Sequence, residues 1–268
     1  MKSLKEYGNA FRTIAMRRVD GILEMRLHTD GGAFQWSLVA HDELEEAFLL
    51  VSRDHANEVV LLTGTGDIFS GPEVPVGASG ARKISHEDFE AIGRVGRRLI
   101  INCLEIPVPV IAAVNGPARR HPELPLLADI VLVAENALFQ DSAHFRGGMV
   151  PGDGVHVVFP HLMGSLRASY FLMTAQEIDA QTALAIGLAN EVVPADQLEA
   201  RSWELARALL AQPREVRHQT RMLMTQELKV KVQQMLGYGF VAERLGHAGG
   251  HNRTKAFCSR QGLIRITE

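Results

Sequence analysis

The chain has 268 residues, of which 46% are hydrophobic and 22% are charged, a composition typical of a globular protein with a sizeable core. The formal net charge of −3 gives no support to nucleic acid or an anionic membrane as a partner. The two cysteines, Cys103 and Cys258, stand far apart, so no disulfide framework is expected. The longest apolar runs are too short to span a bilayer, and we expect a cytoplasmic protein.

Hydrophobic periodicity predicts an α/β protein. The first feature is a hairpin over residues 13–28, which turns at Asp20-Gly21, a pair typical of tight hairpin turns. Because apolar strand-like runs then alternate with helical patterns, the crossover rule predicts a parallel sheet with helices packed on it. The further expected elements are helices over 40–53, 85–104, 155–187 and 195–245, strands over 58–64, 109–116, 128–135 and 137–141, a loop over 69–84, and a loosely packed polar tail from 246.

Chemistry in a parallel sheet gathers at the carboxyl ends of its strands, and two segments at such ends carry histidine. His121 lies in a turn between a predicted strand and helix, where histidine is suited to proton transfer. His144 is followed by Asp153, which stands between two glycines. Each of these residues also has an ordinary interpretation. A histidine in a loop is often only a surface residue, and an aspartate in such a turn usually accepts hydrogen bonds from its own backbone.

Other catalytic classes lack their sequence patterns. The histidines and acids, including Glu243, do not form the short paired spacing of a zinc motif, so we expect no metal and no cofactor. No Gly-x-Ser-x-Gly elbow marks a serine nucleophile, and no glycine-rich loop marks a phosphate site.

Four segments together resemble the crotonase (enoyl-CoA hydratase/isomerase) superfamily. They are EVVLLTGTGDIFSG (58–71), IPVPVIAAVNGPA (106–118), ADIVLVAENALFQD (128–141) and PGDG (151–154). The resemblance runs from about residue 10 to about residue 210. It implies the crotonase (ClpP-like) fold, a spiral of ββα units, for residues 1–200. It also implies a helical C-terminal trimerisation region and polar tail over 201–268, with self-association as a homotrimer or a hexamer built from two trimers.

The chain departs from the coenzyme A branch of that superfamily at its functional positions. The branch has a run of three glycines where this chain has the segment around Arg119–Pro122, and that run supplies one backbone donor of the oxyanion hole. The other donor comes from a loop that corresponds to Ser70–Pro72. Hydratases place two glutamates beside a water. Glu123 falls where the first should be, but the second falls at about Ala143.

These departures resemble the branch of 6-oxocamphor hydrolase and related β-diketone hydrolases. That branch has a histidine in place of the glycine run, a second histidine, an aspartate, and a tryptophan five residues before a His-Asp-Glu-Leu sequence. Here Trp36 stands five residues before His41, and His121, His144 and Asp153 occupy the matching positions. Glu243 falls at a further acidic position of the branch.

The resemblance implies an enzyme that cleaves a carbon–carbon bond of a small cyclic β-diketone with water and gives a keto acid by a retro-Claisen reaction. We predict His121 with Asp153 as the base, Trp36 and His144 as donors to the enolate, and Glu243 as an electrostatic partner. Expected lining residues are Phe34, Val74, Val76 and Phe145. The alternatives are a coenzyme A-dependent hydratase, isomerase or thioesterase, and a non-catalytic crotonase-fold binding protein.

Overall fold

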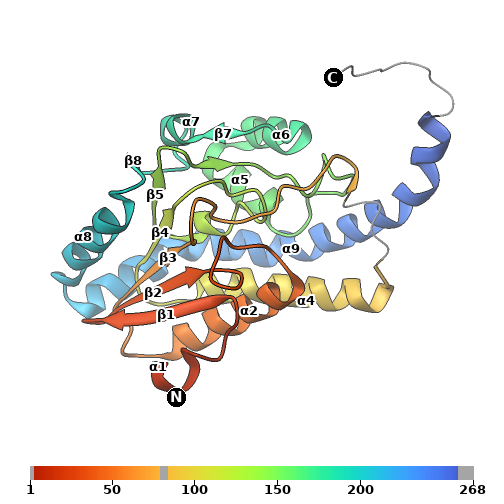
Figure 1. The fold of residues 1–268 in the computed structure, drawn as a ribbon. Helices are drawn as coiled ribbons and strands as arrows, with labels where there is room; N and C mark the ends of the chain where they lie inside the picture. Colours follow the sequence, from red (N-terminus) through yellow and green to blue (C-terminus); the bar gives the residue numbers. More distant parts are fainter. Residues whose placement is uncertain (1–2, 79–83, 259–268) are drawn as a thin grey trace.

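The computed structural model describes residues 3–78 and 84–258 of the chain, without the side chains of 247–258. Figure 1 shows a central sheet between helices. The strands are β1 (Ile14–Val19), β2 (Ile22–Leu27), β3 (Val59–Thr63), β4 (Val110–Val114), β5 (Ile130–Ala134), β6 (Leu138–Phe139), β7 (Ile178–Asp179) and β8 (Glu191–Val193). The helices are α1 (Leu4–Tyr7), α2 (Leu38–Arg53), α4 (His86–Leu104), the 3₁₀ helix η1 (Pro125–Leu127), α5 (Val155–Met163), α6 (Ser165–Thr174), α7 (Ala180–Ala185), α8 (Leu198–Leu210) and α9 (Arg214–Cys258).

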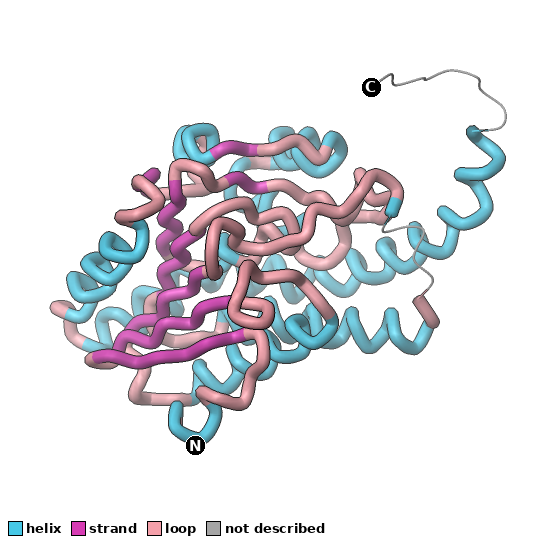
Figure 2. The backbone as a smooth tube through the Cα atoms, in the orientation of Figure 1, coloured by secondary structure: helices cyan, strands magenta, loops and turns pink. Residues whose placement is uncertain are grey.

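The main sheet has the strand order β1-β2-β3-β4-β5-β8. Only the β1–β2 pair is antiparallel, and the remaining pairs are parallel, as the alternation of strands and helices predicts. The hairpin turn places Asp20 and Gly21 at φ 51° and 84°, a conformation that glycine and aspartate adopt more readily than bulky residues. A second, two-stranded sheet pairs β6 with β7, and the tube drawing sets it apart from the main sheet (Figure 2).

The inner strands β3 and β4 are buried on both faces because each face is covered by helices. Successive side chains of a strand point to opposite sides, so Leu61 of β3 packs with Trp203 of α8, whereas Val60 and Leu62 belong to the larger core on the other side. That larger core also takes in residues of α2, α4 and α9. The strand sequences are therefore almost continuously apolar, which is typical of covered parallel sheets.

The structure corrects the expected elements at several places. The stretch 155–187 is interrupted by strand β7, because Ile178 pairs with Phe139. The helix expected from residue 195 begins at Leu198. The polar tail expected from residue 246 continues as helix α9 to Cys258, and residues 259–268 lie outside the described part of the chain. Glycine weakens a helix by only about 1 kcal/mol per residue, so Gly246 does not end a helix that packing supports.

The boundary proposed at residue 200 lies within α8 and stays a prediction. Within the described residues, no helix combines the length and apolar character needed to cross a membrane.

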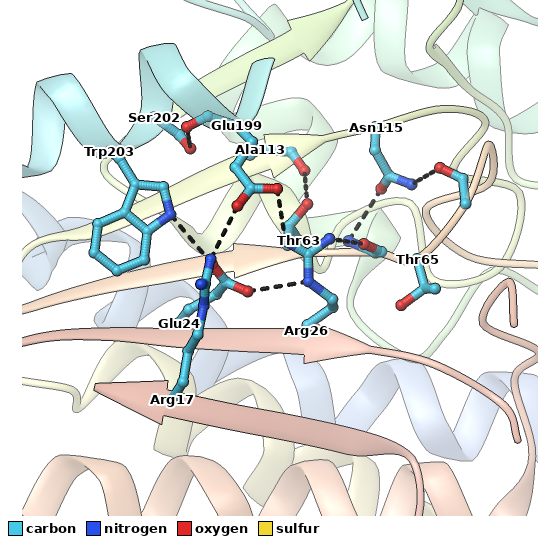
Figure 3. A network of polar contacts seen from close by, with 12 residues as sticks. Arg17, Glu24, Arg26, Thr63, Thr65, Ala113, Asn115, Glu199, Ser202 and Trp203 are labelled. Atoms are coloured by element: carbon cyan, nitrogen blue, oxygen red, sulfur yellow. Dashed lines mark hydrogen bonds and ion pairs between the residues drawn. The ribbon is translucent and has the colours of Figure 1, made fainter. Parts of the chain in front are cut away.

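A charged network holds the outer face of β1 and β2 to α8 (Figure 3). Glu24 is 4% exposed and lies 2.7 Å from Arg17 Nη2 and 3.0 Å from Arg26 Nε. The Trp203 indole donates to the same carboxylate at 3.2 Å. Burial opposes ionisation of Glu24, but the two guanidinium groups outweigh it and lower its pKa below the ordinary value of 4.5.

We therefore expect Glu24→Gln to lower the free energy of unfolding at pH 7 by about 1–3 kcal/mol, since it leaves buried donors without a charged acceptor. The contribution of Glu24 is complete above pH 4.5, the ordinary pKa, and is lost as the pH falls through the lower folded pKa. Urea titrations should therefore show the variant and the wild type converging in acid. Glu199→Gln is the matched control: Glu199 pairs with the same arginines but is exposed, so its loss is worth about 1 kcal/mol or less. An equal effect of both variants would contradict this account.

Candidate functional site

A cavity of about 470 Å³ opens where the loops after β2, β3, β4 and β6 meet helices α2, α4 and α9. The loops after β2, β3 and β4 lie at the carboxyl ends of strands that pair in parallel, where open α/β sheets place their sites. Apolar side chains from α4 and α9 and a set of polar groups form its wall. The lining residues used below are Trp36, His41, Val74, Arg120, His121, Ala143, His144, Asp153 and Glu243.

His121 is held in one orientation by a ring and two carboxylates. Its backbone adopts φ 47°, in the left-handed region, which turns the chain sharply after β4. The imidazole stacks on Trp36 with ring centroids 3.9 Å apart. Its Nδ1 lies 2.9 Å from Glu123 Oε1 and 3.4 Å from Asp153 Oδ2. Among the described residues, Nε2 has no hydrogen-bond partner, so this nitrogen is available to a water or a substrate.

His144 lies between two carboxylates. Its Nδ1 is 2.8 Å from Asp141 Oδ1, and its Nε2 is 3.2 Å from Asp153 Oδ2. Burial opposes protonation of this imidazole, but the carboxylates outweigh it and raise the pKa of His144 well above its ordinary value. Burial would likewise raise the pKa of Asp153, yet His144 and His121 hold it far below its usual range. Asp153 therefore carries a negative charge that two histidines share.

Two further carboxyl groups face this cluster. Burial raises the pKa of Glu243 to about 8, and the negative charge of Asp153 adds to the effect. Burial also raises the pKa of Glu123, partly opposed by His121. Glu243 reaches the cavity from α9, which approaches the loop before α5 closely: a Cβ on Gly152 would stand 2.8 Å from Glu243 Cβ. Glycine at residue 152 is thus required for Glu243 to lie near Asp153.

Three residues that contribute to the site were not identified from the sequence. His41 lines the cavity, with its ring centroid 5.8 Å from those of Trp36 and His121, although the sequence argument used it only as a marker of spacing. Burial, and then the charge of His121, lower its pKa to about 3. Asp141 follows β6 and gave no signal at all. Glu123 was noted only as a hydratase-like position, not as a partner of His121.

Only one of the four expected lining residues lines the cavity. Val74 lines the cavity, as expected. Phe34, Val76 and Phe145 do not. Phe34 is fully buried and packs edge-on against Trp36, with ring centroids 5.8 Å apart, so it supports the wall from behind. Val76 and Phe145 are 75% and 54% exposed. The loops turn these two side chains outward.

Four backbone donors near the site are already used inside the protein. The N–H of Gly71 donates to Phe34 O at 3.0 Å, and that of Ser70 donates to Pro117 O at 3.1 Å. The N–H groups of Arg119 and Arg120 both donate to Ser70 O. These are the two segments that correspond to the oxyanion hole of the coenzyme A branch, so four of their donors are not directed at a ligand.

One group of side chains has the atom types of a metal site. His121, Glu123 and Asp153 each offer one atom, and within the described residues these atoms all lie within 4.8 Å of one another. Residues 121, 123 and 153 do not form a short sequence motif, which is why spacing alone gave no indication of the group.

The fold and this site are those of an α/β enzyme with the crotonase architecture. The family model described as "Enoyl-CoA hydratase/isomerase" matches residues 17–241. The chain belongs to this family, within the crotonase superfamily.

Among solved structures, the chain is similar to a β-diketone hydrolase from the cyanobacterium Anabaena sp. PCC 7120, bound to (S)-3-oxocyclohexyl acetic acid. The two are 37% identical, with a TM-score of 0.85, over 92% of this chain and 98% of that one.

Curated relatives carry coenzyme A names. The chain is 32% identical over 169 residues to a carnitinyl-CoA dehydratase from Citrobacter koseri, which is 63% of each protein. It is 32% identical to a crotonyl-CoA hydratase from Syntrophomonas wolfei, over 58% of this chain and 59% of that one. The aligned parts thus span less than two thirds of these relatives, whereas the β-diketone hydrolase aligns over almost its whole length.

Proposed function

We propose that this chain is a hydrolase that cleaves a carbon–carbon bond of a small cyclic β-diketone and gives a keto acid. The observation that carries the proposal is that Trp36, His121, His144, Asp153 and Glu243 line one cavity. They come from four separate parts of the sequence. The similarity to a β-diketone hydrolase with a keto acid bound supports the same reaction class.

The reaction begins with water. His121 Nδ1 donates its proton to the carboxylates of Glu123 and Asp153, so the lone pair lies on Nε2 and accepts a proton from water as its oxygen attacks a carbonyl carbon. Collapse of the tetrahedral oxyanion breaks the bond to the central carbon, and the electron pair of that bond forms the enolate of the second ketone. A proton returned to the central carbon completes the keto acid. Water and diketone supply all the atoms, and no oxidant is needed.

The proposed mechanism gives His144 a different role from the one expected from sequence. We predicted that it donates to the enolate oxygen, but both ring nitrogens lie against carboxylates. In the proposed mechanism, His144 therefore fixes the position and negative charge of Asp153, and is a positioning residue. The enolate donor that remains is the indole of Trp36.

Trp36→Phe tests this assignment. The indole Nε1 makes no hydrogen bond within the described part of the chain, while the ring stacks on His121. We expect kcat to fall by about 10²-fold, the loss typical of one oxyanion donor, with thermal stability nearly unchanged since Phe keeps an aromatic ring. Steady-state kinetics on a reactive diketone give the readout. An unchanged kcat would remove Trp36 from the list of donors.

The proposed function itself is tested by a screen of cyclic 1,3-diketones, bicyclic and monocyclic, with the keto acid product identified by mass spectrometry. The coenzyme A alternative has support in the names of the curated relatives. Against it stand the occupied donors of Gly71 and Arg120 and the apolar Ala143 in the cavity wall. Retention on a coenzyme A resin with hydration of crotonyl-CoA, and no diketone turnover, would overturn the proposal. A chain inert to both substrate classes would also contradict the proposal and would favour the alternative of a non-catalytic binding protein.

We also propose that the chain associates as a homotrimer or a dimer of trimers. Helix α9 runs past the body of the molecule (Figure 1), and its outer surface carries large apolar side chains that include Leu223, 75% exposed, and Tyr238, 79% exposed. Apolar patches of this kind mark interaction surfaces. Light scattering after gel filtration should give three or six times the chain mass of 29.5 kDa. Leu223→Glu should shift it toward monomer, whereas a monomeric wild type would refute the proposal.

A further inference from the structure

The acidic and imidazole atoms beside the cavity have an arrangement that the hydrolytic mechanism does not fully use. His121 Nδ1, an oxygen of Glu123 and an oxygen of Asp153 lie within 4.8 Å of one another. Glu123 is 2% exposed, and its second oxygen, Oε2, has no hydrogen-bond partner among the described residues. Oδ1 of Asp153 is also buried without a partner there. Buried carboxylate oxygens are normally satisfied. Each of these two carboxylates therefore keeps one unused oxygen, while its other oxygen, Glu123 Oε1 or Asp153 Oδ2, faces His121 Nδ1.

The distances suit a small divalent ion of borderline softness. Zinc binds nitrogen and carboxylate oxygen at about 2.0–2.2 Å, so two tetrahedral ligands stand about 3.4 Å apart. The separation between His121 Nδ1 and Asp153 Oδ2 is 3.4 Å, and that between His121 Nδ1 and Glu123 Oε1 is 2.9 Å. Replacement of the proton between His121 and Glu123 by an ion requires only a small outward movement of one carboxylate. One imidazole and two carboxylates also match the charge of a divalent cation.

We infer that His121, Glu123 and Asp153 form a zinc-binding site, and that zinc bound there inhibits the enzyme. Three protein ligands would leave the fourth tetrahedral position to a water, as is usual in three-ligand zinc sites. Inhibition follows from the tautomer. An imidazole that binds zinc through Nδ1 carries its proton on Nε2, so it can no longer accept a proton from water. Only this inhibitory consequence rests on the proposed function, because the binding itself depends on geometry alone.

The test measures binding directly. Chelator-treated full-length protein is titrated with ZnCl₂ in competition with a chromophoric chelator. We expect one high-affinity ion per chain. Glu123→Gln and Asp153→Asn should each weaken the affinity at least about 10-fold, since even the loss of an outer-shell partner has an effect of that size. Circular dichroism checks that each variant is folded. Because two different ligands are replaced independently, the test remains decisive even when one variant misfolds.

His161→Gln is the control, because His161, one of the 11 histidines of the chain, lies outside the cavity and near the exposed Glu227. Its zinc affinity should equal that of the wild type. Zinc binding that persists in Glu123→Gln and Asp153→Asn, or that is lost in His161→Gln, overturns the inference. Where diketone turnover is measured, zinc should abolish it and chelator should restore it. A chain that binds zinc at this site without diketone turnover would refute the proposed function but not the site.

Discussion

Asp153→Asn is expected to lower kcat on a cyclic β-diketone by about 10³–10⁴-fold while the protein stays folded. Asp153 is the residue that both histidines contact, at 3.4 Å from His121 Nδ1 and 3.2 Å from His144 Nε2. Asparagine keeps the shape but removes the charge that stabilises an imidazolium and fixes its tautomer, a change of comparable effect in other base–carboxylate pairs. Steady-state kinetics with product detection by mass spectrometry check the size of the loss.

The matched control for this variant is Asp196→Asn, which makes the same charge change at an exposed position outside the cavity. It should leave kcat unchanged. Thermal unfolding followed by circular dichroism should show both variants melting within a few degrees of the wild type. If Asp153→Asn keeps more than a tenth of the wild-type kcat, Asp153 does not support the base.

His121→Ala should lower kcat by about 10²–10⁴-fold, the contribution typical of a positioned general base. The substitution leaves a space beside Trp36 in a cavity of about 470 Å³, large enough for a free imidazole. Added imidazole should therefore restore part of the lost rate, with a saturable dependence on its concentration. This readout separates a missing base from a collapsed site, which imidazole cannot repair.

His144→Ala is the companion variant, because the two histidines compete for the same aspartate. If His144 only positions Asp153, imidazole should not rescue its variant, and the kcat loss should be smaller than in His121→Ala. The opposite result, with rescue of His144→Ala and near-normal kcat in His121→Ala, would transfer the role of base to His144.

The elements that sequence predicted best are those whose signal is local. The Asp20-Gly21 turn and the buried strands depend on backbone preferences and short-range periodicity, so they appear where expected. The errors depend on packing. Helix α9 passes through Gly246 because that residue packs on Val150, where a Cβ would stand 2.6 Å from a valine methyl carbon. A contact between residues so far apart in sequence leaves no periodic signal.

The candidate site shows the same division. By itself, the sequence determined the superfamily, which the family match confirms. It also predicted the set Trp36, His121, His144 and Asp153, and these four residues line one cavity, because residues that match a family's motif take the same positions in its fold. Only the tertiary structure decided that both nitrogens of His144 are engaged, and that Glu123 joins His121. It also decided that Phe34, Val76 and Phe145 do not line the cavity. The physical reason is that side-chain direction and hydrogen-bond pairing are set across loops that only the folded sheet brings together.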